Sequence, residues 1–293
     1  MPPKVSPVPD RPSPKPNLLT PGLYLVATPI GNLRDITLRA LDVLGGADVV
    51  LAEDTRVSGK LMAAYGLSVK LERYDEHAAA RARPKILQRL AQGATIALIS
   101  DAGTPLVSDP GWRLVREALA QGSAVVPVPG PSATLAALSV AGLPTDRFMF
   151  CGFPPPKTRA RRAMFAELAP VKSTLIFFEG GSRLAASLTD MAAVFGERDA
   201  AVARELTKLH ETVIRGPLSA LAVNPAFTTP KGEIVILVGP GEDRAATPED
   251  ARAALAEALT RVSPADAASE VARALGLPRR ELYAQALALQ REI

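Results

Sequence analysis

The chain has 293 residues, of which 47% are hydrophobic, 4% aromatic and 22% charged, so it is long enough for two α/β domains with sizeable cores. No apolar run approaches the roughly 18 to 20 residues that cross a bilayer, and the N-terminus lacks the charged-then-apolar order of a secretory signal. We therefore expect a cytoplasmic protein with no membrane partner. A formal net charge of +4 permits an anionic partner such as nucleic acid without requiring one.

Cysteine and histidine are scarce. Cys151 is the only cysteine, which excludes an internal disulfide, and only two histidines accompany it. These counts argue against a structural zinc site, so we expect no metal. We expect Cys151 to be a small buried hydrophobe, as free cysteines usually are.

The chain begins with a proline-rich segment and then changes to alternating strand and helix patterns. Residues 1–21 carry eight prolines and few apolar side chains, which predicts a disordered basic tail that could be deleted (residues 2–20) without loss of folding or cofactor affinity. Short β-rich runs then alternate with helical periods, which is typical of βαβ units and a mostly parallel sheet. For this N-terminal α/β domain, residues 22–130, we predict strands at 23–27, 48–52, 69–73, 94–99 and 124–126, and helices at 36–44, 57–65, 79–91 and 112–120.

After residue 130 the order of elements changes. Residues 131–241 are predicted to form a second α/β domain that completes a cofactor cleft, with helices at 132–140, 157–168 and 183–194 and strands at 148–151, 173–178, 200–203, 209–214 and 233–238. Several of these strands follow one another without a helix, which predicts antiparallel pairs and a mixed sheet. Residues 247–293 read as three helices (247–261, 264–275 and 278–293), with Ser263 and Pro264 as N-cap and first helical residue. We interpret them as a small appended helical module.

Two loops rich in glycine and proline follow neighbouring predicted strands. They span residues 100–111 and 127–133, and the carboxyl ends of strands are where an open α/β sheet builds its ligand crevice. Neither Gly-x-Gly-x-x-Gly nor Gly-x-x-x-x-Gly-Lys-Ser/Thr occurs, so these loops are not phosphate cradles. Loops of this composition suit an adenosine or amino-acid moiety, although a structural turn is an equally good interpretation of any one of them.

Seven ordered blocks of sequence carry a resemblance to a known family. They are Val26–Leu33, Ala52–Arg56, Ser100–Pro105, Ser108–Gly111, Pro129–Ala133, Arg204–Lys208 and Lys231–Glu233. Together they resemble the tetrapyrrole-methylase superfamily, in the branch that methylates ribosomal RNA, from about Gly22 to the C-terminus. One block departs from that pattern: Phe178–Arg183 stands where these proteins usually have Tyr-Glu-Ser-Pro-His-Arg, which puts any role of the histidine in doubt.

The resemblance implies a fold, a cofactor and a reaction. It implies two α/β domains with S-adenosylmethionine in the cleft between them, a homodimer, and methylation of the ribose 2′-hydroxyl of a cytidine in the decoding region of 16S rRNA, free or in the 30S subunit. The residues expected to bind the cofactor are Pro29, Gly31, Asp101, Ala102, Gly103, Ser108, Pro129, Gly130, Ser132, Ala133, Glu179 and Gly232. We expect turn residues such as Asp101, Pro129 and Lys231 to converge on one cavity.

Methyl transfer to a hydroxyl group needs alignment and a proton acceptor. Alignment can supply roughly 7 to 11 kcal/mol, and a general base adds about 100- to 10,000-fold. The candidate bases are Glu53, Asp54, Glu205 and Lys231, and the sequence does not choose among them. Structural interpretations stand beside them: Asp54 or Thr55 as a helix N-cap, Asp101 as a turn residue that bonds its own backbone, and Arg204, Glu205 and Lys208 as a solvated ion-pair cluster.

Basic residues predict an RNA surface. The candidates are Arg34, Arg39, Arg56, Lys157, Arg159, Arg161, Arg162, Arg204 and Lys208. A solvated helix face is the alternative interpretation of the run from Lys157 to Arg162. Two other functions stay open at this point, namely methylation of a tetrapyrrole such as a cobalamin or sirohaem precursor, and RNA binding without catalysis. The basic run and the helical module favour RNA as the substrate.

Overall fold

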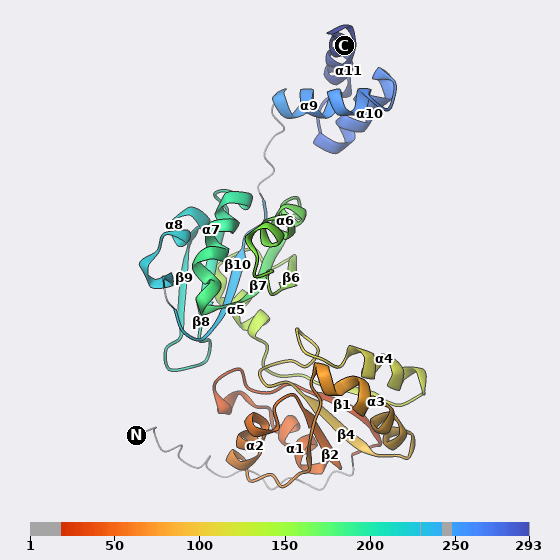
Figure 1. Cartoon of the computed structure of the whole chain (residues 1–293), viewed down its shortest axis with the longest axis vertical. Helices are drawn as coiled ribbons and strands as arrows, with labels where there is room; N and C mark the ends of the chain where they lie inside the picture. Colours follow the sequence, from red (N-terminus) through yellow and green to blue (C-terminus); the bar gives the residue numbers. More distant parts are fainter. Residues whose placement is uncertain (1–18, 229, 242–247, 293) are drawn as a thin grey trace. The chain divides into compact units, whose positions relative to one another are not determined.

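The structure is a computed structural model that describes residues 19–228, 230–241 and 248–292 (Figure 1). Its contacts divide the chain into two compact units, Met1–Pro240 and Gly241–Ile293. Because the first unit holds both sheets, the predicted boundary between two α/β domains at residue 130 stays a prediction. No helix among the described residues has the length and apolar character needed to cross a membrane.

The first sheet has five parallel strands in the order β3-β2-β4-β1-β5. The strands are β1 (Gly22–Val26), β2 (Val49–Ala52), β3 (Leu71–Arg73), β4 (Thr95–Ile99) and β5 (Val125–Val128). Helices α1 (Leu38–Gly46) and α2 (Thr55–Ala64) pack on one face, and α3 (Glu76–Ala91) and α4 (Trp112–Ala120) pack on the other (Figure 1). We call this part, up to β5, the first lobe.

Alternation along the strands explains how both faces of this sheet are covered. In β1, Leu23 packs with α3 and α4 while Tyr24 and Val26 pack with α1 and α2. In β2, Val49 and Leu51 pack with α3 and α4, and Val50 and Ala52 pack with α1 and α2. A parallel sheet that is buried on both faces needs such near-continuous apolar strands, which is the pattern that the sequence showed.

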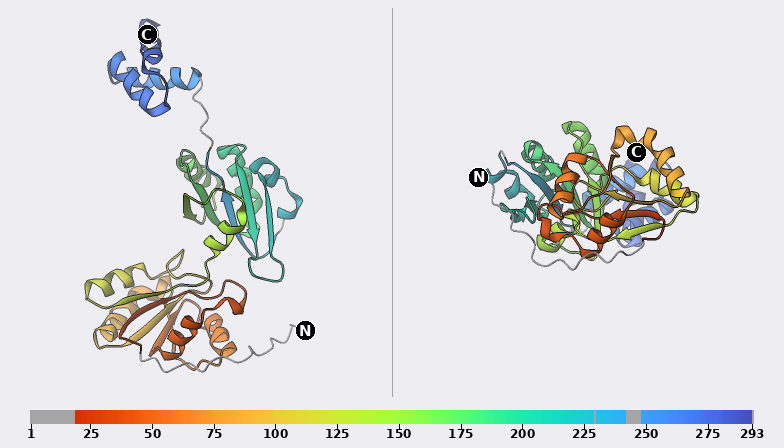
Figure 2. Two further views of the ribbon diagram at one scale, coloured as in Figure 1. Left: turned by 180° about the vertical axis from the view of Figure 1, so that it is seen from behind. Right: turned by 90° about the horizontal axis from the view of Figure 1, so that it is seen from below.

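The second sheet is mixed, as predicted, and has the order β6-β7-β10-β8-β9. Its strands are β6 (Phe148–Gly152), β7 (Thr174–Gly180), β8 (Asp199–Arg204), β9 (Thr212–Pro217) and β10 (Glu233–Val238), and only β6 and β7 pair in parallel. Helices α6 (Thr158–Leu168), α7 (Leu184–Phe195) and α8 (Leu218–Ala222) pack on one face, and α5 (Ala133–Ala141) packs on the other (Figure 2). We call this part, from α5 to β10, the second lobe.

The last unit is a helical module with its own core. Helices α9 (Pro248–Leu259), α10 (Pro264–Leu275) and α11 (Arg279–Glu292) pack through a cluster that includes Leu255, Val271 and Leu282. The Ser263 hydroxyl accepts a hydrogen bond from the backbone of Asp266, so the predicted N-cap is confirmed. The predicted ends of the module, Thr247 and Ile293, lie outside the described residues.

Several sequence-based boundaries were wrong, and each for a local reason. Pro127 and Val128 were assigned to a loop but belong to β5; proline is tolerated there because β5 is an edge strand. Strand β9 begins at Thr212 rather than at residue 209, because the preceding residues form a turn in which Leu209 is exposed. Helix α8 was missed because five residues are too few to show a periodic pattern.

The folded unit begins earlier in the chain than predicted. Residues 1–18 lie outside the described residues, but Leu19 packs against the first-lobe core. The hydroxyl of Tyr24 donates a hydrogen bond of 2.9 Å to the carbonyl of Thr20. Residues 19 and 20 therefore belong to the folded unit and not to a disordered tail.

Candidate functional site

A cavity of about 240 Å³ lies between the two lobes, and we call it the cleft cavity. The first lobe contributes residues from the loops after β1 and β4. The second lobe contributes the start of α5, residues of β7, β8 and β10, and Phe153 and Leu206, which follow β6 and β8. Its lining consists of Ile30, Ser100, Asp101, Ala102, Val107, Ser108, Asp109, Ala133, Phe153, Phe178, Glu179, Ala203, Leu206, Glu233, Ile234 and Val235. The cavity is thus mainly apolar, with a few carboxylates and hydroxyls at defined positions.

A second cavity of about 300 Å³ adjoins it, and we call it the side cavity. The two cavities share Ile30, Ser100, Asp101, Ala102 and Glu233. Further lining residues come from the loop after β1, from α2 and from Lys208: Thr28, Pro29, Gly31, Leu33, Val57, Ser58, Lys60, Leu61 and Lys208. Asp101 therefore stands where the two cavities meet.

Hydrogen bonds tie together the loops that follow β1, β4 and β5. The backbones of Thr28 and Gly103 pair in both directions, at 2.9 and 3.1 Å. The Thr28 hydroxyl donates to the carbonyl of Ser100, and the Thr104 hydroxyl donates to the carbonyl of Pro131. The carboxyl ends of three neighbouring strands are thereby fixed as one wall of the cleft.

The loop after β1 also contacts the second lobe. The backbone N–H of Asn32 donates to the hydroxyl of Thr207 at 3.1 Å. Gly31 lies so close to the side chain of Lys208 that a Cβ atom at this position would collide with it. Glycine at residue 31 is therefore explained by the close approach of the two lobes.

Lys208 connects two carboxylates of the second lobe. Its Nζ lies 2.8 Å from Glu205 Oε1 and 3.1 Å from Glu233 Oε2, and the Glu233 backbone N–H donates to Glu205 Oε1. Hydrogen bonds from Lys208 and from that backbone group lower the pKa of Glu205. A paired carboxylate of lowered pKa is a weak base, which argues against Glu205 as the proton acceptor.

Three carboxylates of the first lobe have a raised pKa, in contrast to Glu205. Burial raises the pKa of Asp101 and of Asp109, and burial together with the charges of Asp109 and Asp101 raises the pKa of Glu53. Asp101 Oδ1 accepts a hydrogen bond of 3.2 Å from the backbone of Asp54, which only partly offsets the burial. Burial destabilises the ionised form of a carboxylate, so these groups bind a proton more strongly than exposed carboxylates do.

Asp54 itself serves the helix that it precedes. It is the N-cap of α2, where its side chain accepts a hydrogen bond from the backbone of Arg56 and pairs with the Arg56 guanidinium at 2.6 Å. The side-chain hydrogen bond from Arg56 holds the pKa of Asp54 well below its usual range. The structural interpretation of Asp54 as an N-cap is confirmed, and this pairing leaves it poorly suited to accept a proton.

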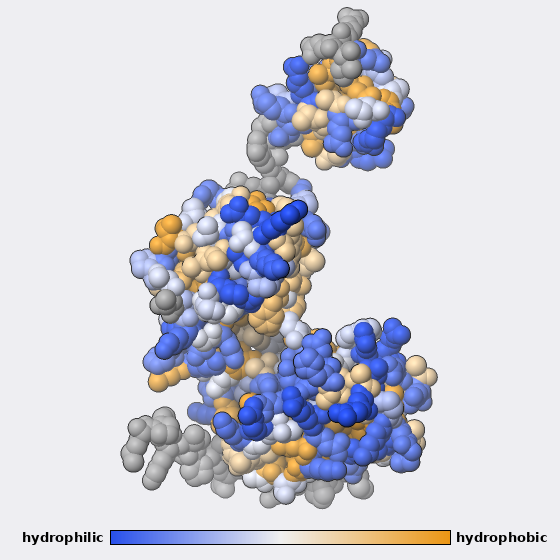
Figure 3. Space-filling model, viewed as in Figure 1, coloured by the Kyte–Doolittle hydropathy of each residue, from blue (hydrophilic) through white to orange (hydrophobic). Residues whose placement is uncertain are grey.

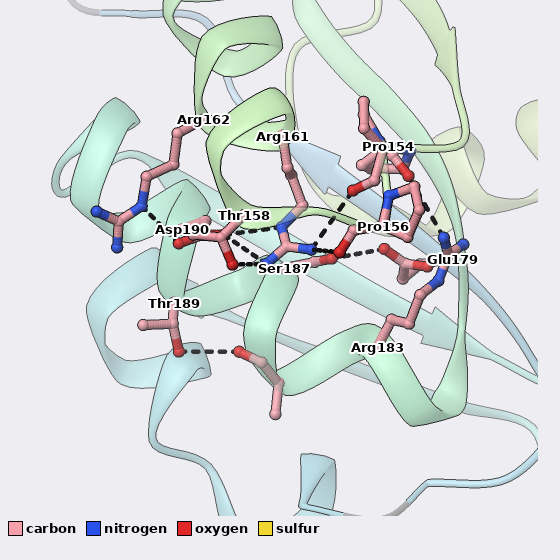
Figure 4. Close-up of polar contacts among 12 residues, drawn as sticks. Pro154, Pro156, Thr158, Arg161, Arg162, Glu179, Arg183, Ser187, Thr189 and Asp190 are labelled. Atoms are coloured by element: carbon pink, nitrogen blue, oxygen red, sulfur yellow. Dashed lines mark hydrogen bonds and ion pairs between the residues drawn. The ribbon is translucent and has the colours of Figure 1, made fainter.

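One predicted RNA-binding residue is buried. Arg161 is 3% exposed, and its guanidinium pairs with Asp190 at 2.5 Å and donates to the carbonyls of Pro155 and Pro156 (Figure 4). The expectation that Arg161 faces a phosphate is therefore wrong, because its partner 29 residues later in the chain draws it inside. Arg162 also binds Asp190 but keeps half of its side chain exposed.

The second-lobe residue Glu179 lines the cleft cavity with both carboxylate oxygens occupied. Oε1 accepts from the backbone of Gly180 and pairs with Arg183 at 2.6 Å, and Oε2 accepts from the hydroxyl of Ser187 at 2.5 Å (Figure 4). Arg183 in turn donates to the carbonyl of Pro154, next to Phe153 in the cavity wall. Glu179 therefore organises this wall, whereas its predicted contact with a cofactor stays a prediction.

Only some of the predicted site residues line the cleft cavity or the side cavity. Asp101, Ala102, Ser108, Ala133 and Glu179 line the cleft cavity, and Pro29, Gly31 and Lys208 line the side cavity. Gly103, Pro129, Gly130, Ser132 and Gly232 line neither. Ser132 is the N-cap of α5, and a Cβ atom on Gly232 would collide with Glu205. The expected convergence on one cavity holds for Asp101 and fails for Pro129 and Lys231.

The remaining catalytic and basic candidates lie elsewhere. Glu53 lines a third cavity of the first lobe, and Lys231 lines a fourth, together with Arg204. Arg34, Arg56, Lys157 and Arg159 are exposed. Cys151 is half-buried against the second-lobe core, where burial raises the pKa of its thiol to about 11.

Several lining residues were not singled out from the sequence. They are Ile30, Val107, Asp109, Phe153, Phe178, Leu206 and Glu233, among others. Ile30, Asp109, Leu206 and Glu233 lie within the blocks that carried the resemblance, so membership of those blocks was the available signal. No sequence signal pointed to Phe153, because its place in the cavity wall depends on the contacts of Pro154.

The family of this two-lobed chain is shown by comparison with known proteins. The family model of tetrapyrrole (corrin/porphyrin) methylases matches residues 22–222, and the chain belongs to this family. A second model, described as the RsmI C-terminal HTH domain, matches residues 245–290.

Within that family the relatives point to one group. The chain is 52% identical over 274 residues to the ribosomal RNA small subunit methyltransferase I of Mesorhizobium japonicum, covering 93% of each chain, and 51% identical to that of Erythrobacter litoralis, covering 93% of this chain and 96% of that one. Among solved structures, a uroporphyrin-III C-methyl transferase from Thermus thermophilus complexed with S-adenyl homocysteine has a TM-score of 0.53. It is 20% identical and covers 74% of this chain and 97% of its own, a likeness that concerns the fold.

Proposed function

We propose that this protein is an S-adenosylmethionine-dependent methyltransferase that methylates the ribose 2′-hydroxyl of a cytidine in the decoding region of 16S rRNA. The observation that carries the proposal is the near-complete alignment, at about half identity, with proteins named ribosomal RNA small subunit methyltransferase I. The basic surface and the helical module support a large anionic substrate over a small macrocycle.

The cleft cavity fits the cofactor in its chemistry. Its apolar walls suit the adenosine, and Asp101, Asp109 and Glu233 offer negative charge to a ligand that carries a positive sulfonium and an ammonium group. No phosphate cradle is required, in keeping with the loop sequences. When bound, S-adenosylmethionine supplies a methyl group on a positively charged sulfur, and transfer of that methyl to ribose O2′ leaves S-adenosylhomocysteine and a proton.

We assign to Asp101 the role of the base that accepts the proton of the ribose 2′-hydroxyl. A ribose hydroxyl is a very weak acid, so a carboxylate within reach of O2′ speeds its attack by about 100- to 10,000-fold. Of the four bases considered from the sequence, none lines the cleft or side cavity. Asp101 lines both, and burial raises its pKa, so it can take the proton where the two cavities meet.

The partners and the location follow from the same proposal. The substrate is 16S rRNA or the 30S subunit, so the enzyme acts in the cytoplasm. A homodimer is part of the proposal through the family resemblance, and sedimentation of the purified protein tests it.

The decisive experiment offers the purified protein three acceptors with labelled cofactor: 30S subunits, free 16S rRNA and uroporphyrinogen III. Mass spectrometry of nuclease fragments then locates the methyl group. A 2′-O-methylcytidine in the decoding region supports the proposal. Label on a base or on the macrocycle overturns it. A non-catalytic RNA-binding protein predicts no transfer and no cofactor binding, which calorimetric titration with S-adenosylmethionine measures.

A further inference from the structure

The side cavity has the composition of a nucleotide site. Leu33, Val57 and Leu61 give it an apolar side, and the exposed Lys60 brings a cationic group to its lining. Lys208 also lines it but is paired with Glu205 and Glu233. Exposed Arg34 and Arg56 are the chain neighbours of the lining residues Leu33 and Val57. A base needs an apolar surface and a phosphate needs cations, and this cavity offers both.

The third cavity of the first lobe is a useful contrast. It has a volume of about 470 Å³, but its lining includes Glu53, Glu76 and Asp109. Of the two arginines in its lining, Arg83 pairs with Glu117 at 2.9 Å and Arg113 lies over the ring of Trp112. The side cavity has two carboxylates of its own, Asp101 and Glu233, but Glu233 is paired with Lys208 and Lys60 adds a further cation. It is therefore less repulsive to a phosphodiester than this larger space.

Ser58 supplies an independent sign of a ligand. It is 3% exposed, it lines the side cavity, and within the described part of the chain its hydroxyl has no hydrogen-bond partner. A buried hydroxyl without a partner costs stability, so such a group calls for an explanation. Rotation of the Ser58 side chain toward the adjoining cavity would let a ligand oxygen complete its hydrogen bonding.

We propose that the side cavity takes the acceptor nucleotide of the RNA, with the ribose held between Ser58 and Asp101 and the flanking phosphate at Lys60. This assignment rests on the proposed function, because it takes the substrate to be RNA and the cleft cavity to hold the methyl donor. The shared lining of the two cavities then brings the ribose to the cofactor, with Asp101 between them.

The first test concerns Lys60. We expect Lys60→Gln to weaken binding of a decoding-region RNA oligonucleotide about fivefold at moderate salt and to reduce the log–log salt slope by about 0.7 to 0.9, as loss of one phosphate contact does. Lys85→Gln is the matched control, because Lys85 is an exposed lysine on α3, which covers the opposite face of the sheet. Equal effects of the two changes overturn the assignment.

The second test concerns Ser58 and separates binding from folding. We expect Ser58→Ala to raise the KM for RNA about three- to tenfold while leaving cofactor affinity unchanged and thermal stability equal or higher, since it removes an unpaired buried hydroxyl. A purely structural serine would lose stability and leave the KM unchanged, which contradicts the proposal. Ser58→Thr, which restores the hydroxyl, is expected to recover most of the RNA affinity.

Failure of this assignment and failure of the proposed function give different results. If the wild-type protein methylates 30S subunits while Lys60→Gln and Ser58→Ala bind RNA normally, the nucleotide site is wrong and the function stands. If both variants lose RNA affinity but the wild-type protein transfers no methyl group, the site stands and the function is wrong. Filter binding of the oligonucleotide measures RNA affinity without turnover, so both results are accessible.

Discussion

Buried carboxylates of the two lobes differ in whether they are paired with a cation. In the second lobe, Asp190 is paired with Arg161 and Arg162, and Glu179 is paired with Arg183 and bonded to Ser187 (Figure 4). In the first lobe, burial and neighbouring carboxylates raise the pKa values of Glu53, Asp101 and Asp109. Paired buried charges hold a structure in one arrangement, whereas poorly compensated ones are typical of sites that exchange protons.

This difference gives each lobe a distinct task. The second-lobe network fixes the segment that carries Phe153 and so shapes a wall of the cavity. The first lobe presents carboxylates of raised pKa, and two of them, Asp101 and Asp109, lie on the loop after β4, which backbone bonds tie to the loop after β1. Hydrophilic side chains occur over both lobes and the helical module in Figure 3, so an exposed polar position alone says little about function. What separates the two lobes is whether the charge has a partner.

The largest expected effect comes from Asp101 in the first lobe. Asp101→Asn keeps the acceptor for the Asp54 backbone N–H but removes the base, so we expect kcat to fall about 100- to 10,000-fold. We expect a much smaller loss of cofactor affinity, because Asp109 and Glu233 still offer negative charge to the cofactor. Single-turnover methylation and calorimetric titration measure the two quantities. In the wild-type protein, activity falls as the pH drops through the raised pKa of Asp101, which lies above 3.8.

The amide change at Glu53 is the control for Asp101. Glu53 also has a raised pKa, but it lines the third cavity and not the cleft. We expect Glu53→Gln to retain activity within about tenfold. A loss at Glu53 as large as that at Asp101 would mean that the wrong carboxylate has been assigned.

The second prediction concerns folding and belongs to the second lobe. Asp190→Ala leaves the buried Arg161 guanidinium without its acid, and removing one partner of a buried pair costs about 3 to 5 kcal/mol. Arg162→Gln removes the other, half-exposed partner of the same carboxylate and is expected to cost less than about 1 kcal/mol. Urea denaturation of both variants checks the contrast. Similar losses for the two would show that the burial of Arg161 is not what matters.

The third prediction concerns Asp109 of the first lobe, where loss of the carboxylate is expected to raise stability rather than lower it. Because burial raises the pKa of Asp109, the folded state binds its proton more tightly than the unfolded state does, and ionisation of Asp109 lowers stability at neutral pH. We expect Asp109→Asn to be more stable than wild type near neutral pH, with the gain disappearing as the pH falls below the ordinary value of 3.8. Thermal unfolding across a pH series measures it.

Asp75 supplies the comparison for that series. A hydrogen bond from the backbone of Ala78 lowers the pKa of Asp75, so its ionised form stabilises the fold, and that contribution is lost as the pH falls. Asp75→Asn is therefore expected to be less stable than wild type at neutral pH, with the difference closing in acid. The same sign for both variants would contradict the contrast between compensated and uncompensated carboxylates.

The fold was largely predictable, because hydrophobic period fixes element type. The apolar runs that became β2 and β4 and the periodic segment that became α4 were found, since their patterns are local. The mixed second sheet followed from strands without intervening helices. Pro127 in β5 and the short α8 were missed because tolerance for proline at an edge, and a helix of one turn, depend on neighbours in space.

The site was predictable only as far as the blocks of sequence reached. The loop after β4 was located correctly, Pro29 and Gly31 after β1 were named within a block, and Asp101 was among the candidates. The state of each charge was not, because Arg161 meets Asp190 and Lys208 meets Glu233 across 29 and 25 residues of chain. Pairing decides whether a charged residue is structural or reactive, and pairing at such distances is set by packing.

The smallest expected effect tests where the folded unit begins. Deletion of residues 2–18 removes a segment with little apolar surface, so we expect unfolding free energy and cofactor affinity to stay unchanged. Deletion of residues 2–20 also removes Leu19 from the first-lobe core and the carbonyl partner of the Tyr24 hydroxyl, and loss of one such hydrogen bond costs about 1 kcal/mol. Urea titration resolves the two deletions, and Tyr24→Phe in the longer one separates the hydrogen bond from the packing. If the bond is the cause, this change restores stability, since the buried ring no longer carries an unpaired hydroxyl.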